Sequence, residues 1–191
     1  MENNDQLIKV KLNRKIESGA EASLFFDCEA SIPLMVDVYG IARDGEIQMP
    51  FFYPILAVYD SYGWDIQPMD HDGERRYAEV SDYSLCIEAP SDYEIVCSGN
   101  EVSRETKNGA TTYSFVAEKR RDIIFCAYTD YVKMERIVDN TRLLGFFNVA
   151  KSPVAMAHVM DTAAFALEYF SRVYMEYPYD TLIITNTAWG I

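Results

Sequence analysis

The sequence predicts a mainly β fold: a sandwich-like β domain over residues 1–149, followed by one long helix and one strand over residues 150–191. Three observations predict it. Up to about residue 149, short apolar runs of strand type are separated by turn residues. Aromatic residues make up 14% of the chain, and strands favour aromatic and β-branched side chains. After residue 150 the apolar spacing becomes that of a helix.

The first predicted strand is QLIKVKL (6–12), where alternation places Ile8, Val10 and Leu12 on one face. Runs of the same type follow at 21–27, 33–40 and 51–60. Turns are expected between them, where reversal of the chain is easy, at Gly19, Asp44-Gly45 and 61–63.

The later strands are predicted at YSLCIEA (83–89), YEIVCSG (93–99), DIIFCAYTDY (122–131) and TRLLGFFNVA (141–150). Between the second and third of these, residues 101–119 read as a hairpin. Its turn is Asn108-Gly109, the dipeptide that a type I′ turn favours.

A helix of about 22 residues is predicted from Ser152, an N-cap residue followed by Pro153 at the first helical position. Its apolar positions recur at three- and four-residue spacings: Met156, Met160, Ala163, Leu167, Phe170 and Tyr174. Further apolar residues widen this stripe beyond what a helix on one surface needs, so neighbours are expected on more than one side. The uninterrupted run TLIIT (181–185) predicts a strand covered on both faces.

The formal net charge of −13 excludes nucleic acid as an expected partner, because binding to the phosphate backbone depends on Lys and Arg. No apolar run approaches the roughly 20 residues that cross a bilayer. The start MENNDQLIKV lacks the basic and apolar regions of a signal peptide, which favours the cytoplasm.

Four cysteines, Cys28, Cys86, Cys97 and Cys126, lie far apart without CxxC spacing, which argues against a zinc knuckle or a thioredoxin-like pair. Buried, reduced thiols are the first interpretation. The alternative is a disulfide between Cys86 and Cys97 across the turn at 90–92.

Only two histidines are present. His158 and Asp161 share a helical face, but a zinc site takes three or four ligands, so we expect a structural or solvent-exposed pair. His71 lies in the acidic turn MDHDGE, which lacks the regular ligand spacing of a calcium loop. No GxSxG, P-loop, GxGxxG or HExxH motif occurs.

Two other groups of side chains have the composition of possible sites. The carboxylate pairs Glu79 with Asp82 and Asp92 with Glu94 lack a basic or histidine partner, which disfavours a glycosidase-like acid and base. The aromatic residues of the second group are more often packing residues than a sugar-binding platform: Tyr53, Tyr59, Tyr62 and Trp64.

The order of these segments resembles the zinc aminopeptidases of the aminopeptidase N and leukotriene hydrolase type, the gluzincin metallopeptidases. The resemblance rests on FFYPILAVYDSYGW (51–64), YAEVSDYSLCIEAPSDYEIVCSGNE (77–101), the hairpin arm at 112–117, DIIFCAYTDYV (122–132) and the helix and strand over 155–185. It covers nearly the whole chain.

The resemblance implies a saddle-like N-terminal β domain that precedes a thermolysin-like catalytic domain. Gly190 and Ile191 resemble the first positions of the family's exopeptidase motif, with the amine-binding glutamate absent. Gln48 lies in the region from which the family supplies a side chain to the substrate's amine. No zinc ligand, general base or transition-state tyrosine maps onto the chain, so the chain holds no cofactor and zinc is expected in a parent enzyme.

The resemblance therefore predicts an inactive N-terminal fragment, truncated at both ends, of an enzyme that acts on peptides. Its expected partner is the missing catalytic domain, and self-association through the 152–174 helix is a further expectation. The alternative is a self-standing β-sandwich module that binds a protein or a glycan. Reading the gene beyond residue 191 separates the two.

Overall fold

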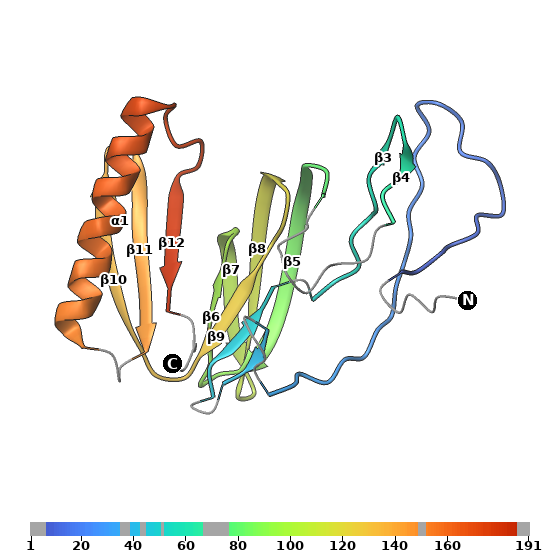
Figure 1. Ribbon diagram of the computed structural model, residues 1–191. Helices are drawn as coiled ribbons and strands as arrows, with labels where there is room; N and C mark the ends of the chain where they lie inside the picture. The colour runs from blue at the N-terminus through green and yellow to red at the C-terminus, as the bar shows by residue number, and fades with distance from the viewer. Residues whose placement is uncertain are drawn as a thin grey trace. The chain divides into compact units, whose positions relative to one another are not determined.

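The computed structural model describes residues 7–34, 39–42, 45–50, 52–66, 77–148 and 152–186. The chain divides into two units. Unit 1 comprises residues 1–31 and 54–79, and unit 2 comprises residues 32–53 and 80–191. The described residues are mainly β, with several sheets, one helix and a strand after the helix, as the sequence predicts (Figure 1).

In the described part of unit 1, β3 (Tyr59–Asp60) and β4 (Gly63–Trp64) form a small hairpin. The predicted turn at 61–63 is confirmed, and Gly63 has a φ of 102° that suits glycine. The predicted strands at 6–12 and 21–27 are wrong, because residues 7–31 are in no strand. Alternation supplies an apolar face, but a strand also requires a partner for its backbone hydrogen bonds, and local sequence does not encode one.

The predicted strand at 51–60 is also wrong over most of its described length, since only Tyr59 and Asp60 are in a strand. Pro54 has no backbone N–H for a ladder, which disfavours a strand through this segment. Phe52 and Tyr53 instead pack on the core of unit 2. Of the predicted strand at 33–40, the structure describes only the ends, with Leu34 in an isolated bridge and Gly40 in β1.

The residues of unit 2 that the structure describes form three sheets. The central sheet has the order β1-β2-β9-β6, the outer sheet β5-β8-β7, and the helix-covered sheet β10-β11-β12. The strands are β1 (Gly40–Ile41), β2 (Ile47–Met49), β5 (Ser81–Pro90), β6 (Glu94–Cys97), β7 (Asn100–Lys107), β8 (Ala110–Arg120), β9 (Phe125–Tyr128), β10 (Tyr131–Val138), β11 (Thr141–Asn148) and β12 (Thr181–Thr185).

The hairpin predicted over 101–119 is confirmed as β7 and β8. Asn108 and Gly109 have φ values of 54° and 80°, as a type I′ turn requires at both central positions. The sequence reading missed β10, which pairs with β11 through a turn at Asp139 and Asn140. Asp139 has a φ of 51°, a conformation that Asp adopts more readily than most residues.

Three apolar clusters join these layers. The first lies between the outer and central sheets and includes Tyr113, Phe115 and Ile95. The second lies between the central sheet and β11, where Tyr128 meets Leu144 and Phe146. The third lies between β11 and the helix α1 (Pro153–Val173). Strand β11 is therefore buried on both faces.

Gly145 in the middle of β11 allows α1 to approach the sheet closely. A Cβ placed on it would collide with the Phe147 ring and the Met160 sulfur. Met160 is completely buried, as is Leu143 on the same face of β11. Glycine is thus required here by packing, in addition to any effect on strand propensity.

The helix starts where the sequence predicts, with Ser152 before Pro153, although the Ser152 side chain makes no capping hydrogen bond. Met156, Met160 and Leu167 are buried, as the predicted stripe requires. The last two stripe positions are exposed, at 53% for Phe170 and 77% for Tyr174. In Figure 1 the helix lies along the β10-β11-β12 sheet.

Strand β12 is parallel to β11, and α1 is the connection between them. Ile183 packs toward the central sheet, whereas Leu182 and Ile184 pack toward α1. Both faces of β12 thus contact apolar residues, but all five of its residues are only half-buried, so the expected cover is partial. The domain boundary predicted near residue 149 stays a prediction.

All four cysteines are free, as the first interpretation expects, and the alternative of a disulfide between Cys86 and Cys97 is wrong. Cys86 lies on β5 in the outer sheet and Cys97 on β6 in the central sheet. Two thiols, Cys97 and Cys126, are buried as expected, whereas those of Cys28 and Cys86 are exposed. Burial raises the pKa of both Cys97 and Cys126 to about 11.

We expect a thiol reagent at neutral pH to modify Cys28 and Cys86 rapidly, and Cys97 and Cys126 only after denaturation. The thiolate is the reactive form, and burial suppresses both its formation and its access to the reagent. Mass spectrometry of peptides after timed labelling identifies the modified positions. Rapid native-state labelling of Cys97 or Cys126 would contradict the described core.

No helix among the residues that the structure describes is long and apolar enough to span a membrane.

Candidate functional site

The candidate site is a buried polar cluster formed by Glu46, Gln48, Asn148 and Asn186, hereafter the Glu46 cluster. Gln48, on β2, is 4% exposed. Its Nε2 donates to Glu46 Oε1 at 2.6 Å and to the backbone oxygen of Asn186 at 3.0 Å. The second bond joins residues 138 positions apart, and so connects β2 to the end of β12.

Asn186, the residue after β12, holds the cluster together. Its Nδ2 donates to Glu46 Oε2 at 3.0 Å, and its Oδ1 accepts from the backbone N–H of Asn148 at 2.6 Å. Its own backbone N–H donates to Phe146 at 3.3 Å. Both oxygens of the Glu46 carboxylate therefore accept side-chain amide hydrogens, which offsets the cost of burying a group that is only 2% exposed.

The network fixes the orientation of the Gln48 amide. Both groups beside Nε2 are hydrogen-bond acceptors, so the nitrogen rather than the oxygen must face them. Both hydrogens of Nε2 are thereby used within the protein. Among the described residues no group donates to Oε1, which can therefore accept a further hydrogen bond.

The buried carboxylate affects its neighbours on the central sheet. The pKa of Tyr128 is raised, first by burial and then by the charges of Cys126 and Glu46. Negative charge at this cluster therefore disfavours further anions nearby and favours a cationic group.

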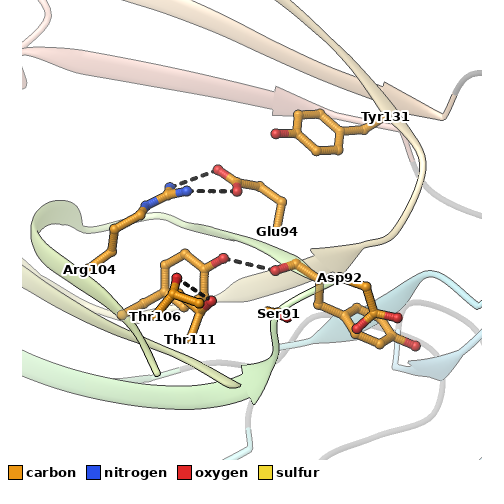
Figure 2. Close-up of a pocket in the computed structure, with 9 residues that line it drawn as sticks. Ser91, Asp92, Glu94, Arg104, Thr106, Thr111 and Tyr131 are labelled. Carbon is orange, nitrogen blue, oxygen red and sulfur yellow. Dashed lines mark hydrogen bonds and ion pairs between the residues drawn. The ribbon is translucent and has the colours of Figure 1, made fainter. Parts of the chain in front are cut away.

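A second polar feature is a hollow of about 270 Å³ between the outer sheet and β6 and β10 (Figure 2). Arg104 donates four hydrogen bonds there, two to Glu94 and two to Glu101, with distances of 2.8 to 2.9 Å. Its guanidinium also lies over the Tyr113 ring, 4.8 Å from the centroid. Tyr131 faces this ion pair from across the hollow.

The polar side chains of the hollow mostly bond other protein groups. Thr106 and Thr111 share a hydrogen bond at 2.9 Å, and the Tyr113 hydroxyl donates to the Tyr93 backbone oxygen at 2.8 Å. The pair of Arg104 with Glu94 connects β7 to β6, and so joins the outer sheet to the central one. We therefore assign the hollow a stabilising role and no ligand.

The Arg104 pairs should make stability depend on pH. The hydrogen bonds that Arg104 donates, followed by its positive charge, hold the pKa of Glu101 below the usual range. A carboxyl whose folded pKa is depressed stabilises the fold above its unfolded pKa, about 4.3, and loses this effect as pH falls through the folded value. We expect Arg104→Met to cost about 1 kcal/mol at pH 7, because the pairs are partly exposed. That cost should shrink below about pH 4.

Urea denaturation of both proteins from pH 3 to 7 measures this difference. The matched control is Arg142→Met, which removes the more exposed pair with Glu135 and should have a smaller effect. A cost for Arg104→Met that stays constant across this range would contradict the role given to Glu101.

The other candidates from the sequence do not form a site. Asp161 pairs with Arg136, and His158 is exposed. Asp82 accepts a hydrogen bond from the backbone N–H of Lys119 at 2.8 Å. Glu94 is held by Arg104. The turn around His71 lies outside the described residues, as do Gly190 and Ile191.

The aromatic residues of the possible sugar-binding platform are divided between the two units. Tyr53 packs in the core of unit 2, where its hydroxyl donates to Asp122 at 3.0 Å. Tyr59 and Trp64 meet edge to face in unit 1, with ring centroids 5.0 Å apart. Within the part of the chain that the structure describes, no group of three or more His, Cys, Asp or Glu side chains could hold a metal ion.

The sequence reading named Gln48 but missed Glu46, Asn148 and Asn186. The spacing of Glu46 and Gln48 places both on one face of a strand, which is a usable signal. Nothing local connects them to Asn186, since that contact depends on the pairing of β12 with β11 and the packing of both on the central sheet.

No protein-family model matches the chain, and no curated protein matches it. Some solved structures do match the chain, at low sequence identity. An M1 zinc metallopeptidase from Deinococcus radiodurans is 12% identical over 56% of this chain and 26% of its own, with a TM-score of 0.44. A mutant two-domain M1 zinc metallopeptidase bound to L-tryptophan is 12% identical over 83% of this chain and 35% of its own, with a TM-score of 0.48. The chain thus spans about a quarter to a third of the length of these structures.

Proposed function

We propose that this chain is the N-terminal, non-catalytic part of a zinc-dependent aminopeptidase of the aminopeptidase N and leukotriene hydrolase type. In this proposal the β sheets form one wall of the substrate cleft, and α1 and β12 open the thermolysin-like catalytic domain. The parent enzyme removes N-terminal residues from peptides, and the piece alone is inactive.

The observation that carries the proposal is the hydrogen bond from Gln48 to Asn186. The resemblance assigns Gln48 to the region that meets the substrate's amine, and assigns Gly190 and Ile191 to the truncated exopeptidase motif. Asn186 precedes that motif by four positions in the sequence. The bond supports the assignment because it brings the Gln48 side chain to the strand from which the motif follows.

The chemistry of the cluster also supports this role. The Gln48 Oε1 atom is an acceptor, and the Glu46 carboxylate provides a fixed negative charge beside it. A protonated α-amine is a cationic donor, and its hydrogen bonds are favoured by both groups. Binding a free amine at this point would select peptides by their N-terminus.

In the parent enzyme, zinc would lower the pKa of a bound water toward neutrality. The described residues of this chain do not fit a zinc site, so we derive no catalytic step from them. The contribution of this chain is to bind and orient the substrate and to limit access to the cleft.

Reading the gene beyond Ile191 tests the proposal most directly. We expect the frame to continue with a glutamate soon after Gly190 and Ile191, and then an HExxH motif within about a hundred residues. A stop codon immediately after Ile191 would overturn the proposal in favour of the self-standing binding module. A frame that continues without zinc ligands would indicate an inactive relative.

In the parent enzyme, Gln48→Met is expected to lower kcat/KM for peptides. Loss of a hydrogen bond to a charged group costs about 1.5–3 kcal/mol, or roughly 10- to 150-fold. The matched control is Thr106→Val in the hollow, which should leave kcat/KM unchanged. Steady-state kinetics, with thermal melting to confirm folding, measures both. Unchanged kinetics in a folded Gln48→Met enzyme would remove Gln48 from the amine site.

For the purified 191-residue chain, we expect no tight zinc binding by calorimetry and no hydrolysis of aminoacyl-anilides. Reproducible turnover by this chain would contradict the absence of catalytic residues from it.

A further inference from the structure

We propose that Arg120 and the Tyr179 ring form a clasp that holds the connection between α1 and β12 against the outer sheet. A one-residue bulge in β8 turns Arg120 toward this ring. The connection comprises residues 174–180 and is called the strap below. Opening the clasp frees the strap, while the sheets on either side keep their own pairing. The inference concerns contacts within unit 2 and does not depend on the proposed function.

Tyr179 makes contacts on both sides of the strap. The Arg120 guanidinium lies over its ring, 3.0 Å from the centroid. Its hydroxyl donates to the Lys119 backbone oxygen at 3.3 Å. Its backbone oxygen accepts from the Thr141 hydroxyl, at the start of β11, at 3.4 Å. One residue of the strap therefore connects the outer sheet to the helix-covered sheet, through partners 60 and 38 positions away in the sequence.

The pairing of β5 with β8 explains why Arg120 faces the strap. Tyr83 lies opposite Ala117, whose side chain packs on the central sheet. The pairing resumes at Ser81 and Arg120, so two steps along β5 match three steps along β8. Strand β8 therefore contains one extra residue, which is a β-bulge. Because side chains alternate between the faces of a strand, Lys119 would otherwise share the inner face with Ala117, and the bulge places Arg120 there instead.

The surroundings of the bulge hold it in place. Lys119 has a φ of 53°, in the left-handed region that lysine rarely adopts. Its backbone N–H donates to the Asp82 carboxylate at 2.8 Å. A strained backbone persists only where its surroundings hold it. Here Asp82 holds the N–H of Lys119, and the Tyr179 hydroxyl holds the C=O of the same residue.

The clasp also accounts for a buried donor. The Arg120 Nε atom is buried, and no hydrogen-bond acceptor among the described residues meets it. A buried donor without a partner is costly. The face of an aromatic ring attracts a guanidinium, so the Tyr179 ring offsets part of this cost. Tyr177 meets Tyr179 edge to face, with ring centroids 5.4 Å apart, and so supports the ring from within the strap.

The turn between β10 and β11 holds the strap from the other side. The Asn140 amide donates to the Glu176 carboxylate at 3.4 Å, and the Arg142 backbone N–H donates to the Asp180 backbone oxygen at 2.8 Å. The Arg142 amide therefore reports whether the strap is in place, because it loses its acceptor when Asp180 moves away.

Amide hydrogen exchange by NMR in the 191-residue chain tests the clasp. Arg120→Met removes the cation, and should raise the exchange rate of the Arg142 amide about 10-fold. Exchange at the Tyr113 amide, in the centre of the outer sheet, should not change. An unchanged rate at Arg142 would overturn the proposal. An equal rise at Tyr113 would also overturn it, since the whole fold rather than the strap would then have been loosened.

A double-mutant cycle tests whether Arg120 acts through the Tyr179 ring. Tyr179→Leu should raise exchange at Arg142 at least as much as Arg120→Met, and it tests the same contact if Arg120→Met does not fold. The double variant should add little to Tyr179→Leu alone, because both substitutions remove one contact. Tyr179→Phe keeps the ring and loses only the hydroxyl, so its effect should be smaller. Additive effects in the double variant would overturn the direct contact.

The matched control is Arg172→Met. The Arg172 guanidinium also lies over a tyrosine ring, 5.9 Å from the Tyr169 centroid, but on α1 and outside the clasp. Exchange at the Arg142 amide should therefore be the same in this variant as in the unmodified chain. A rise as large as that in Arg120→Met would overturn the proposal, because loss of any arginine–tyrosine contact would then free the strap.

Discussion

Leu143→Ala is expected to lower the free energy of unfolding by about 2–5 kcal/mol. Leu143 is 0% exposed and lies between β11 and α1, beside Met156 and Met160. Shortening it removes apolar contact and leaves a cavity, because Gly145 already lets the helix lie as close to the sheet as the side chains allow. Urea denaturation followed by circular dichroism measures the loss.

The matched control is Val154→Ala on α1, where Val154 is 79% exposed. An exposed substitution of this kind should change stability by less than about 0.5 kcal/mol. Equal effects of the two substitutions would indicate that α1 does not pack on β11 in solution. A loss for Leu143→Ala below about 1 kcal/mol would contradict the described core in the same way.

Glu46→Ala is expected to cost about 2–4 kcal/mol, since the amides of Gln48 and Asn186 each lose a buried acceptor at about 1–3 kcal/mol. The loss should separate the end of β12 from the central sheet. Hydrogen exchange should therefore rise at Asn148, whose N–H is held by Asn186. Denaturation curves and exchange at this amide measure the two effects.

The substitution Glu46→Gln tests whether the stability lost in Glu46→Ala comes from the two amide hydrogen bonds that the carboxylate accepts. Its side chain has the same shape, but one oxygen becomes an NH₂ group, which cannot accept from an amide donor. We therefore expect a smaller destabilisation than for Glu46→Ala. If Glu46→Gln were as stable as the unmodified chain, the carboxylate would not be accepting both amides.

Much of the fold could be predicted locally. The Asn108-Gly109 turn, the alternation in β5 and β8, and the helix start at Pro153 are each encoded by a few neighbouring residues. The run at 6–12 shows where local evidence fails: its alternation is as regular as that of β5, yet it forms no described strand. Strand formation depends on a partner strand, and pattern alone does not specify one.

The candidate site was only partly predictable for a related reason. Gln48 was selected through the family resemblance, and Glu46 could have been added from strand spacing. Asn186 could not have been predicted, because its contact with Gln48 joins residues 138 positions apart in the sequence. No periodicity or motif extends over that separation.

By itself, the sequence determined the β-rich class, the helix with its apolar stripe, the strand after it and the absence of a recognisable catalytic motif. These follow from short-range patterning and turn chemistry. The tertiary structure decided which strands pair, which cysteines are buried, which half of the helix stripe is covered and how Glu46, Gln48 and Asn186 meet. Those features depend on contacts between distant segments, whose formation reflects the burial of whole layers rather than the preferences of single residues.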